Sequence, residues 1–150
     1  MSDFEVRLFE NNASIVRIGE GLLGRTLPRE EWTHEAHLGA CTWIIRDHPD
    51  IVPEHEMSSI ISGFNESVGG VNDDSQGYHE TITQVYIAAV RVHLADITAD
   101  VSLNEAVNAL LLSPRGQRDL PLKHYSKELL FSVAARRRFV EPDRADLDQI

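Results

Sequence analysis

Two histidines, His34 and His37, stand three residues apart in the segment WTHEAHL, which spans residues 32–38. On a helix this spacing brings the two Cβ atoms within about 5–6 Å, close enough to share one metal ion or one hydrogen-bonded substrate. The pattern is not that of the zincin metalloproteases, whose two metal-binding histidines are four positions apart. Glu35 points away from the line joining the two rings. Spacing alone therefore permits a site at this helix start but does not specify its chemistry.

A second group lies in the segment GYHETIT, residues 77–83, where a polar loop enters the strongest helical pattern of the chain. His79 falls on the same face as Ile82 and Tyr86, so its imidazole is expected to point inward, with Glu80 at the edge of that face. A buried imidazole needs partners for its ring nitrogens. Two interpretations stay open: a core histidine bonded to a carboxylate or carbonyl, and a ligand or general base.

A third candidate is His124 in the polar segment LKHYSK, residues 122–127, which follows a proline-containing connection. This segment could close over the ends of the helices that carry His37 and His79, although no periodicity ties it to them. Tyr125 could supply a phenol to the same pocket or serve as a packing residue.

Together these groups predict a polar pocket that His37 and His79 both face. The proposed metal ligands are His34, His37 and His79, and the proposed catalytic residues are Glu80 and His124. Imidazole-rich ligation suits one divalent zinc, iron, nickel or copper ion, and an open coordination position would acidify a bound water, with Glu80 or Glu35 as general base. The reaction of such an enzyme on a small molecule is not specified.

Two functions without catalysis remain open beside this enzyme hypothesis. The same pocket could belong to a binding module that captures a small ligand. Alternatively, the histidines could be structural partners within a helical bundle, with an apolar helix face forming a homodimer.

The other candidate side chains are expected to be structural. His93 lies fourteen residues after His79, about 21 Å along a helix, too far to share a metal with it, and is predicted to be a satisfied core or interface histidine. His48 and His55 are expected at the surface. Cys41 has apolar neighbours, which favours an inert buried thiol over a nucleophile.

Helical periodicity defines the elements that must position these residues. We expect helices near residues 14–23, 33–47, 53–68, 78–97, 103–111 and 126–131, with a further turn or two near residues 132–139. No segment alternates convincingly as a strand. The sequence therefore predicts an all-α, compact bundle of about five or six helices. Its expected core comprises Leu38, Ile44, Met57, Ile60, Phe64, Ile82, Val85, Tyr86, Ala89, Leu110 and Phe131.

Size and composition indicate one globular domain over residues 1–150, with a polar acidic tail from about residue 141. The net charge of -10 disfavours nucleic-acid binding. The short basic run at residues 136–138 is flanked by acidic residues, which favours a solvated helix end over a phosphate-binding patch. No stretch is apolar enough for a membrane span, and residues 1–5 lack the start of a secretory signal. Cytoplasmic residence is the default expectation.

Three blocks of this sequence carry a resemblance to other proteins. Residues 31–38, residues 77–83 and the HYS segment at residues 124–126 resemble a group of small bacterial helical proteins of uncharacterised function. A second likeness, to bundles of the DinB and YfiT type that gather three histidines around a metal, is architectural only. This chain does not reproduce their histidine spacing, so the likeness implies no catalytic set.

Overall fold

The computed structural model describes residues 5–150, which form eight α-helices and three short 3-10 turns without any strand. The predicted all-α class is confirmed. The first four residues, which include most of the segment used to argue against a secretory signal, lie outside the described part. The α-helices are α1 (Asn12–Leu23), α2 (His34–Asp47), α3 (Pro53–Ser67), α4 (Glu80–Ala95), α5 (Leu103–Leu112), α6 (Leu120–His124), α7 (Lys127–Leu130) and α8 (Val133–Arg137). The 3-10 turns are η1 (Arg29–Glu31), η2 (Pro114–Gly116) and η3 (Leu147–Gln149).

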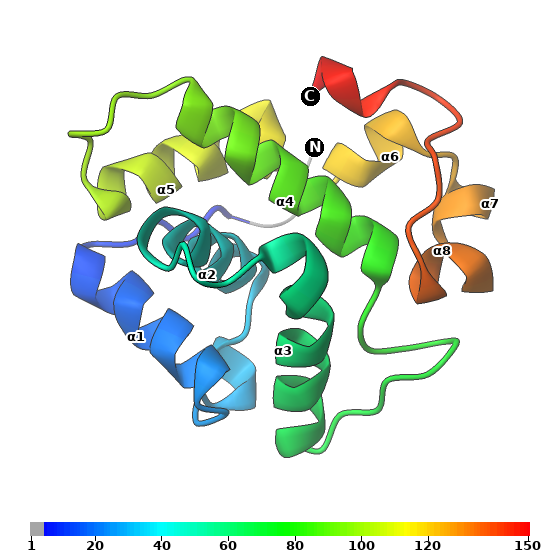
Figure 1. Cartoon of the computed structure of the whole chain (residues 1–150), viewed down its shortest axis with the longest axis horizontal. Coiled ribbons are helices and arrows are strands. Elements are labelled where there is room, and N and C mark those ends of the chain that lie inside the picture. The colour runs from blue at the N-terminus through cyan, green and yellow to red at the C-terminus, as the bar shows by residue number, and fades with distance from the viewer. Residues whose placement is uncertain (1–4) are drawn as a thin grey trace.

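Helix α4 is the central element of the bundle (Figure 1). It packs against α2, α3, α5, η2 and α8. Short polar side chains begin several of the helices. Thr33 accepts a hydrogen bond from the Ala36 amide at the start of α2, and Ser102 accepts one from the Glu105 amide at the start of α5. These caps determine where each helix begins and therefore which residues occupy its first turn.

Buried apolar side chains form two clusters. The larger cluster lies among the five helices α1, α2, α3, α4 and α5. Its fully buried members include Ile15, Leu22, Phe64 and Leu110. The smaller cluster joins α4 to the carboxyl-terminal helices through Val85, Ala89, Leu120, Tyr125 and Leu130. Tyr125 is thus a packing residue, and its hydroxyl donates to the Val140 carbonyl at 2.6 Å.

Most of the expected core is buried, with one clear error. Ile60, Ile82 and Tyr86 are only partly buried. The other residues of the expected core, except Phe131, are buried. Phe131 was expected inside but is 60% exposed. Helix α7 ends at Leu130, which takes the buried position, and Phe131 follows as the C-cap with its side chain outward.

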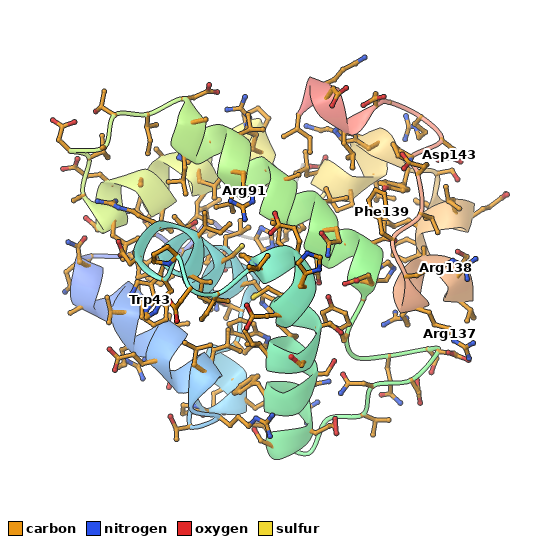
Figure 2. The ribbon with its side chains drawn as sticks, viewed as in Figure 1. Trp43, Arg91, Arg137, Arg138, Phe139 and Asp143 are labelled. Atoms are coloured by element: carbon orange, nitrogen blue, oxygen red, sulfur yellow. The ribbon has the colours of Figure 1, made fainter. Side chains whose placement is uncertain are left out.

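The polar acidic segment from about residue 141 is held against the rest of the protein by hydrogen bonds. Asp143 accepts hydrogen bonds from the Ser126 amide and hydroxyl, both at 2.7 Å, and Figure 2 shows it on the segment beside the last helices. His124 holds the same segment, since its Nδ1 donates to the Ala145 carbonyl at 2.8 Å and its own carbonyl accepts from the Arg144 amide. These bonds close the end of the chain over α6.

Within residues 5–150, every helix is too short or too polar to cross a lipid bilayer.

Candidate functional site

The first turn of α2 forms one wall of a pocket of about 330 Å³ that lies between α2, α3 and α4. Five apolar side chains line it: Leu38, Met57, Ile61, Ile82 and Ile87. Its other lining residues are His34, His37, Cys41, Thr83, Tyr86 and Arg118. The combination of an apolar body with a few polar groups is typical of sites for small molecules.

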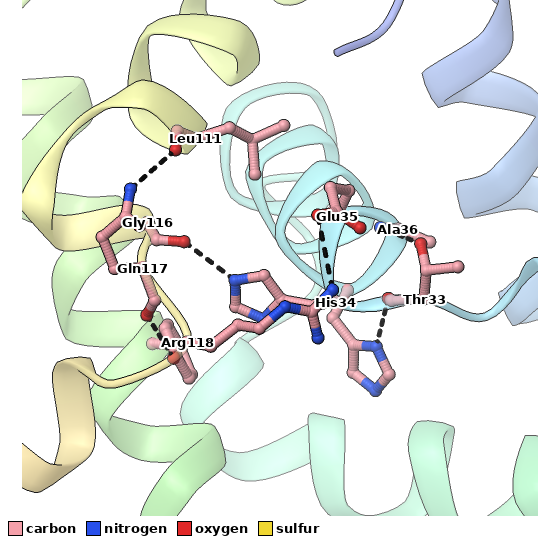
Figure 3. Close-up of polar contacts among 10 residues, drawn as sticks. Thr33, His34, Glu35, Ala36, Leu111, Gly116, Gln117 and Arg118 are labelled. Atoms are coloured by element: carbon pink, nitrogen blue, oxygen red, sulfur yellow. Dashed lines mark hydrogen bonds and ion pairs between the residues drawn. The ribbon is translucent and has the colours of Figure 1, made fainter. Parts of the chain in front are cut away.

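His34 uses one ring nitrogen for structure. Its Nε2 lies 2.8 Å from the Gly116 carbonyl oxygen (Figure 3), and because a carbonyl only accepts, this nitrogen carries the proton. In the neutral ring Nδ1 is then an acceptor with a lone pair. The pKa of His34 is lowered, first by burial and then by the positive charge of Arg118, against the raising effect of the Gly116 hydrogen bond.

Gly116 reaches His34 because it has no side chain. A Cβ atom at this position would lie 2.1 Å from the Leu110 carbonyl oxygen. The turn η2 therefore packs directly against the end of α5, which places the Gly116 carbonyl within reach of α2.

His37 shows the same division between its two nitrogens. Its Nδ1 donates to the Thr33 carbonyl at 2.7 Å, which leaves Nε2 as the acceptor of the neutral ring. The ring lies against Trp32, with 3.8 Å between the ring centroids. Burial lowers the pKa of His37 to about 4, despite the raising effect of the Thr33 hydrogen bond. At neutral pH this imidazole is uncharged and presents a lone pair.

Glu35 and Arg118 form an ion pair beside these rings. Glu35 is 3% exposed, and its Oε2 lies 3.5 Å from Nη2 of Arg118, whose side chain crosses toward the start of α2 (Figure 3). The other carboxylate oxygen, Oε1, is buried without a hydrogen-bond partner. Glu35 lines neither this pocket nor the second one described below. It holds Arg118 at the pocket wall and is not placed to act as the general base that the sequence suggested.

The start of α4 is organised differently. His79 is the N-cap of this helix, one residue before its first turn, where its Nδ1 accepts the Ile82 amide at 3.1 Å. Its Nε2 donates to the Leu130 carbonyl at 2.7 Å. Both nitrogens are occupied, so no lone pair remains for a metal or a substrate. Burial is the main cause of its lowered pKa. The geometry matches the core-histidine interpretation and removes His79 from the proposed metal ligands.

Beside the first pocket lies a second one of about 360 Å³, and His37 and His79 both line it. Its other lining residues are Trp32, Ile61, Asn65, Gly77, Tyr78, Ile82, Thr83, Phe131 and Arg136. His37, Ile61, Ile82 and Thr83 belong to both pockets. The two pockets are therefore neighbours with a common wall.

The predicted metal centre and catalytic pair are not assembled. Among residues 5–150, no group of three or more His, Cys, Asp or Glu side chains is arranged to hold a metal ion. Glu80 lines neither pocket, and its Oε1 accepts the Tyr78 hydroxyl at 2.5 Å. His124 also lies outside both pockets and clamps the carboxyl-terminal segment. Each of these side chains has a local structural partner that its position in the sequence did not reveal.

His55 is exposed as expected, whereas His48 is half-buried with its ring centroid 4.2 Å from that of Trp43. His93 joins α4 to α5 through a 2.8 Å hydrogen bond from Nε2 to the Ala106 carbonyl, as predicted for an interface histidine. Cys41 is buried, and burial raises the pKa of its thiol to about 12. The thiol therefore stays protonated and is a poor nucleophile.

Sequence reasoning missed the two arginines of the site. Arg118 lies between η2 and α6, where no helical period relates it to α2, and Arg136 was assigned to a solvated helix end. Trp32 offered the one available signal, because an aromatic residue five positions before His37 precedes a polar helix start.

Comparisons with protein families, with curated proteins and with solved structures found no significant match to this chain.

Proposed function

We propose that the protein binds a small, largely apolar molecule, which places an uncharged hydroxyl or amide hydrogen-bond donor in the pocket at the start of α2. The observation that carries this proposal is that His34 and His37 each use one ring nitrogen for a backbone carbonyl while both rings line the same apolar pocket. The remaining nitrogens are acceptors on rings that line the pocket, and an acceptor in this position favours a ligand that can donate to it.

Electrostatics favour binding over general-base catalysis at this site. A catalytic base works best when its pKa is near the working pH, whereas the pKa of His37 is about 4. A ring that stays neutral from acidic to alkaline pH is a constant hydrogen-bond acceptor and a weak base. The positive charge of Arg118 is balanced locally by Glu35, so the first pocket has no net charge to attract an ion.

The pocket dimensions support a ligand of fragment size. A volume of about 330 Å³ is at the lower end of the range of roughly 300–1,000 Å³ for small-molecule sites. Five apolar side chains form its body, so most of the ligand surface would be hydrocarbon, with one polar group directed at the imidazoles.

Calorimetry and thermal unfolding with a panel of small neutral phenols and alkanols test this proposal, with para-propylphenol as the reference probe. We expect concentration-dependent stabilisation of the wild-type protein, and loss of most of it in His37→Gln. His55→Gln is the matched control, because His55 is exposed on α3 and lines neither pocket. Absence of binding across the panel, or equal binding by His37→Gln, would contradict the proposal.

A metal titration tests the alternative hypothesis that this pocket binds a metal ion. Metal-free protein is titrated with Zn²⁺ in the absence of any organic probe. We expect no stoichiometric stabilisation that depends on His37, and a clear one would replace ligand binding with metal binding as the function of this pocket.

A further inference from the structure

The second pocket carries more information about the ligand. It shares the wall formed by His37, Ile61, Ile82 and Thr83 with the first pocket. A molecule held against His37 in the first pocket would reach the second by extending past these four side chains. The two together offer space for a ligand about twice as large as either alone.

A positively charged group lies at the wall of the second pocket. Arg136 donates from Nη1 to the carbonyls of Gly77 and Tyr78, at 3.0 and 3.3 Å. Among residues 5–150 no carboxylate lies within ion-pair distance of its guanidinium. A guanidinium has five N–H donors in a fixed fork, so Nε and Nη2 remain for an acceptor from the ligand.

The next arginine shows that this arrangement is particular to Arg136. Arg137 makes a two-pronged ion pair with Asp74, at 2.6 and 2.7 Å, and lines neither pocket. Figure 2 shows its side chain on the outer face, near Arg138. Of the two neighbours, Arg137 is neutralised at the surface and Arg136 brings its charge to the pocket.

Aromatic rings complete the second pocket. Trp32 lies against His37, and Tyr78 belongs to the loop that Arg136 tethers. Phe131 also lines the pocket although its side chain is 60% exposed. Its exposure at a pocket edge gives a ligand apolar surface that the fold itself does not cover.

We infer that one ligand occupies both pockets: an aryl or alkyl monocarboxylate with a hydroxyl group at its far end. The hydroxyl donates to the imidazole acceptors of the first pocket, the apolar chain passes the shared wall, and the carboxylate meets the Arg136 fork. This inference rests on the proposed function and adds the ligand class. A carboxylate matches the planar fork of an arginine, and its single charge suits one arginine on a protein of net charge -10 better than a polyanion would.

Three matched probes test the inference by calorimetry on the full chain. Para-hydroxyphenylbutyrate carries both polar groups, para-propylphenol lacks the carboxylate, and phenylbutyrate lacks the hydroxyl. We expect para-hydroxyphenylbutyrate to bind about tenfold more tightly than either single-ended probe, the effect of one good charge-assisted contact. Shorter and longer hydroxyphenyl alkanoates determine which chain length spans the wall best.

Two arginine variants assign the carboxylate contact. Arg136→Ala should remove the tenfold gain and leave para-propylphenol binding within about twofold of wild type. Arg137→Ala is the control, since it also frees the loop at residues 71–77 from α8 but removes no charge from the pocket. Arg136→Lys, which keeps the charge and the tether without the fork, should retain only part of the gain.

Each outcome bears on one statement. The inference is overturned if the carboxylate adds no affinity, or if the gain in affinity persists in Arg136→Ala. In either case, binding of para-propylphenol would leave the proposed function standing. Binding of para-hydroxyphenylbutyrate that needs Arg136 but is unaffected by His37→Gln also overturns it, because the ligand would then occupy the second pocket alone. Failure of every neutral probe and of all three matched probes contradicts the proposed function itself.

Discussion

The starts of α2 and α4 both place imidazoles at a helix amino terminus, but they use them in opposite ways. At α2, His34 and His37 each spend one nitrogen on a backbone carbonyl and line a pocket with the ring. At α4, His79 spends one nitrogen on capping its own helix and the other on Leu130. Among histidines that line a pocket, the number of ring nitrogens that the fold itself consumes therefore separates a binding candidate from a structural residue.

The largest expected effect comes from breaking the structural side of this comparison. His79→Ala removes a helix cap and leaves the Leu130 carbonyl without its buried donor, which should lower the free energy of unfolding by roughly 2–4 kcal/mol. Urea unfolding measures it. His79→Asn keeps a good cap and should recover part of the loss, while His55→Ala serves as an exposed control. A cost of His79→Ala below about 0.5 kcal/mol would show that His79 does not hold α4 to α7.

Acid should destabilise the fold through the α2 start. The pKa of His37 is about 4 in the folded protein and about 6.5 in the unfolded chain. Between these values the unfolded state binds more protons, so stability falls as the pH is lowered from 6.5 to 4. We expect His37 to account for roughly 1–3 kcal/mol of this fall, the larger figure being the full pKa difference. The free energy of unfolding of His37→Gln should depend less steeply on pH between 6.5 and 4. An unchanged pH dependence would show that the ring is not neutral and buried.

A smaller effect is expected for the ion pair behind the pocket. Arg118→Ala leaves the buried carboxylate of Glu35 without its cation and should lower the free energy of unfolding by about 1–2 kcal/mol, because Arg118 itself is partly exposed. In a Glu35→Gln background the same change should cost less. A double-mutant cycle gives the coupling, and additive effects would mean that the pair does not hold Arg118 at the pocket.

Local chemistry made much of the fold predictable from the sequence. Thr33 and Ser102 mark helix starts, because a capping side chain bonds to an amide three residues later. The placement of His34 and His37 on one face follows from helical spacing alone. The first turn of α2 could therefore be identified as a possible site before any tertiary structure was known.

The roles of the individual histidines depend on contacts between segments that are distant in the sequence. His79 was expected inside the helix, but α4 begins one residue after it, so a nitrogen that would have been free toward the pocket caps the helix instead. Its second partner, the Leu130 carbonyl, lies 51 residues away. The Gly116 carbonyl that fixes His34 is similarly remote, 82 residues away. Sequence periodicity carries no information on which remote carbonyl consumes a ring nitrogen, so it could not separate these roles.

Ring nitrogen chemical shifts test the central claim most directly. Protein labelled with ¹⁵N at histidine is titrated with para-propylphenol at neutral pH, because a protonated and an unprotonated ring nitrogen resonate at well-separated frequencies. The account predicts neutral rings protonated at Nε2 in His34 and His79 and at Nδ1 in His37. It further predicts that the probe shifts the unprotonated nitrogens of His34 and His37 and leaves those of His79 unchanged. A His37 ring protonated at Nε2, or a probe that shifts His79 and not His37, would contradict it.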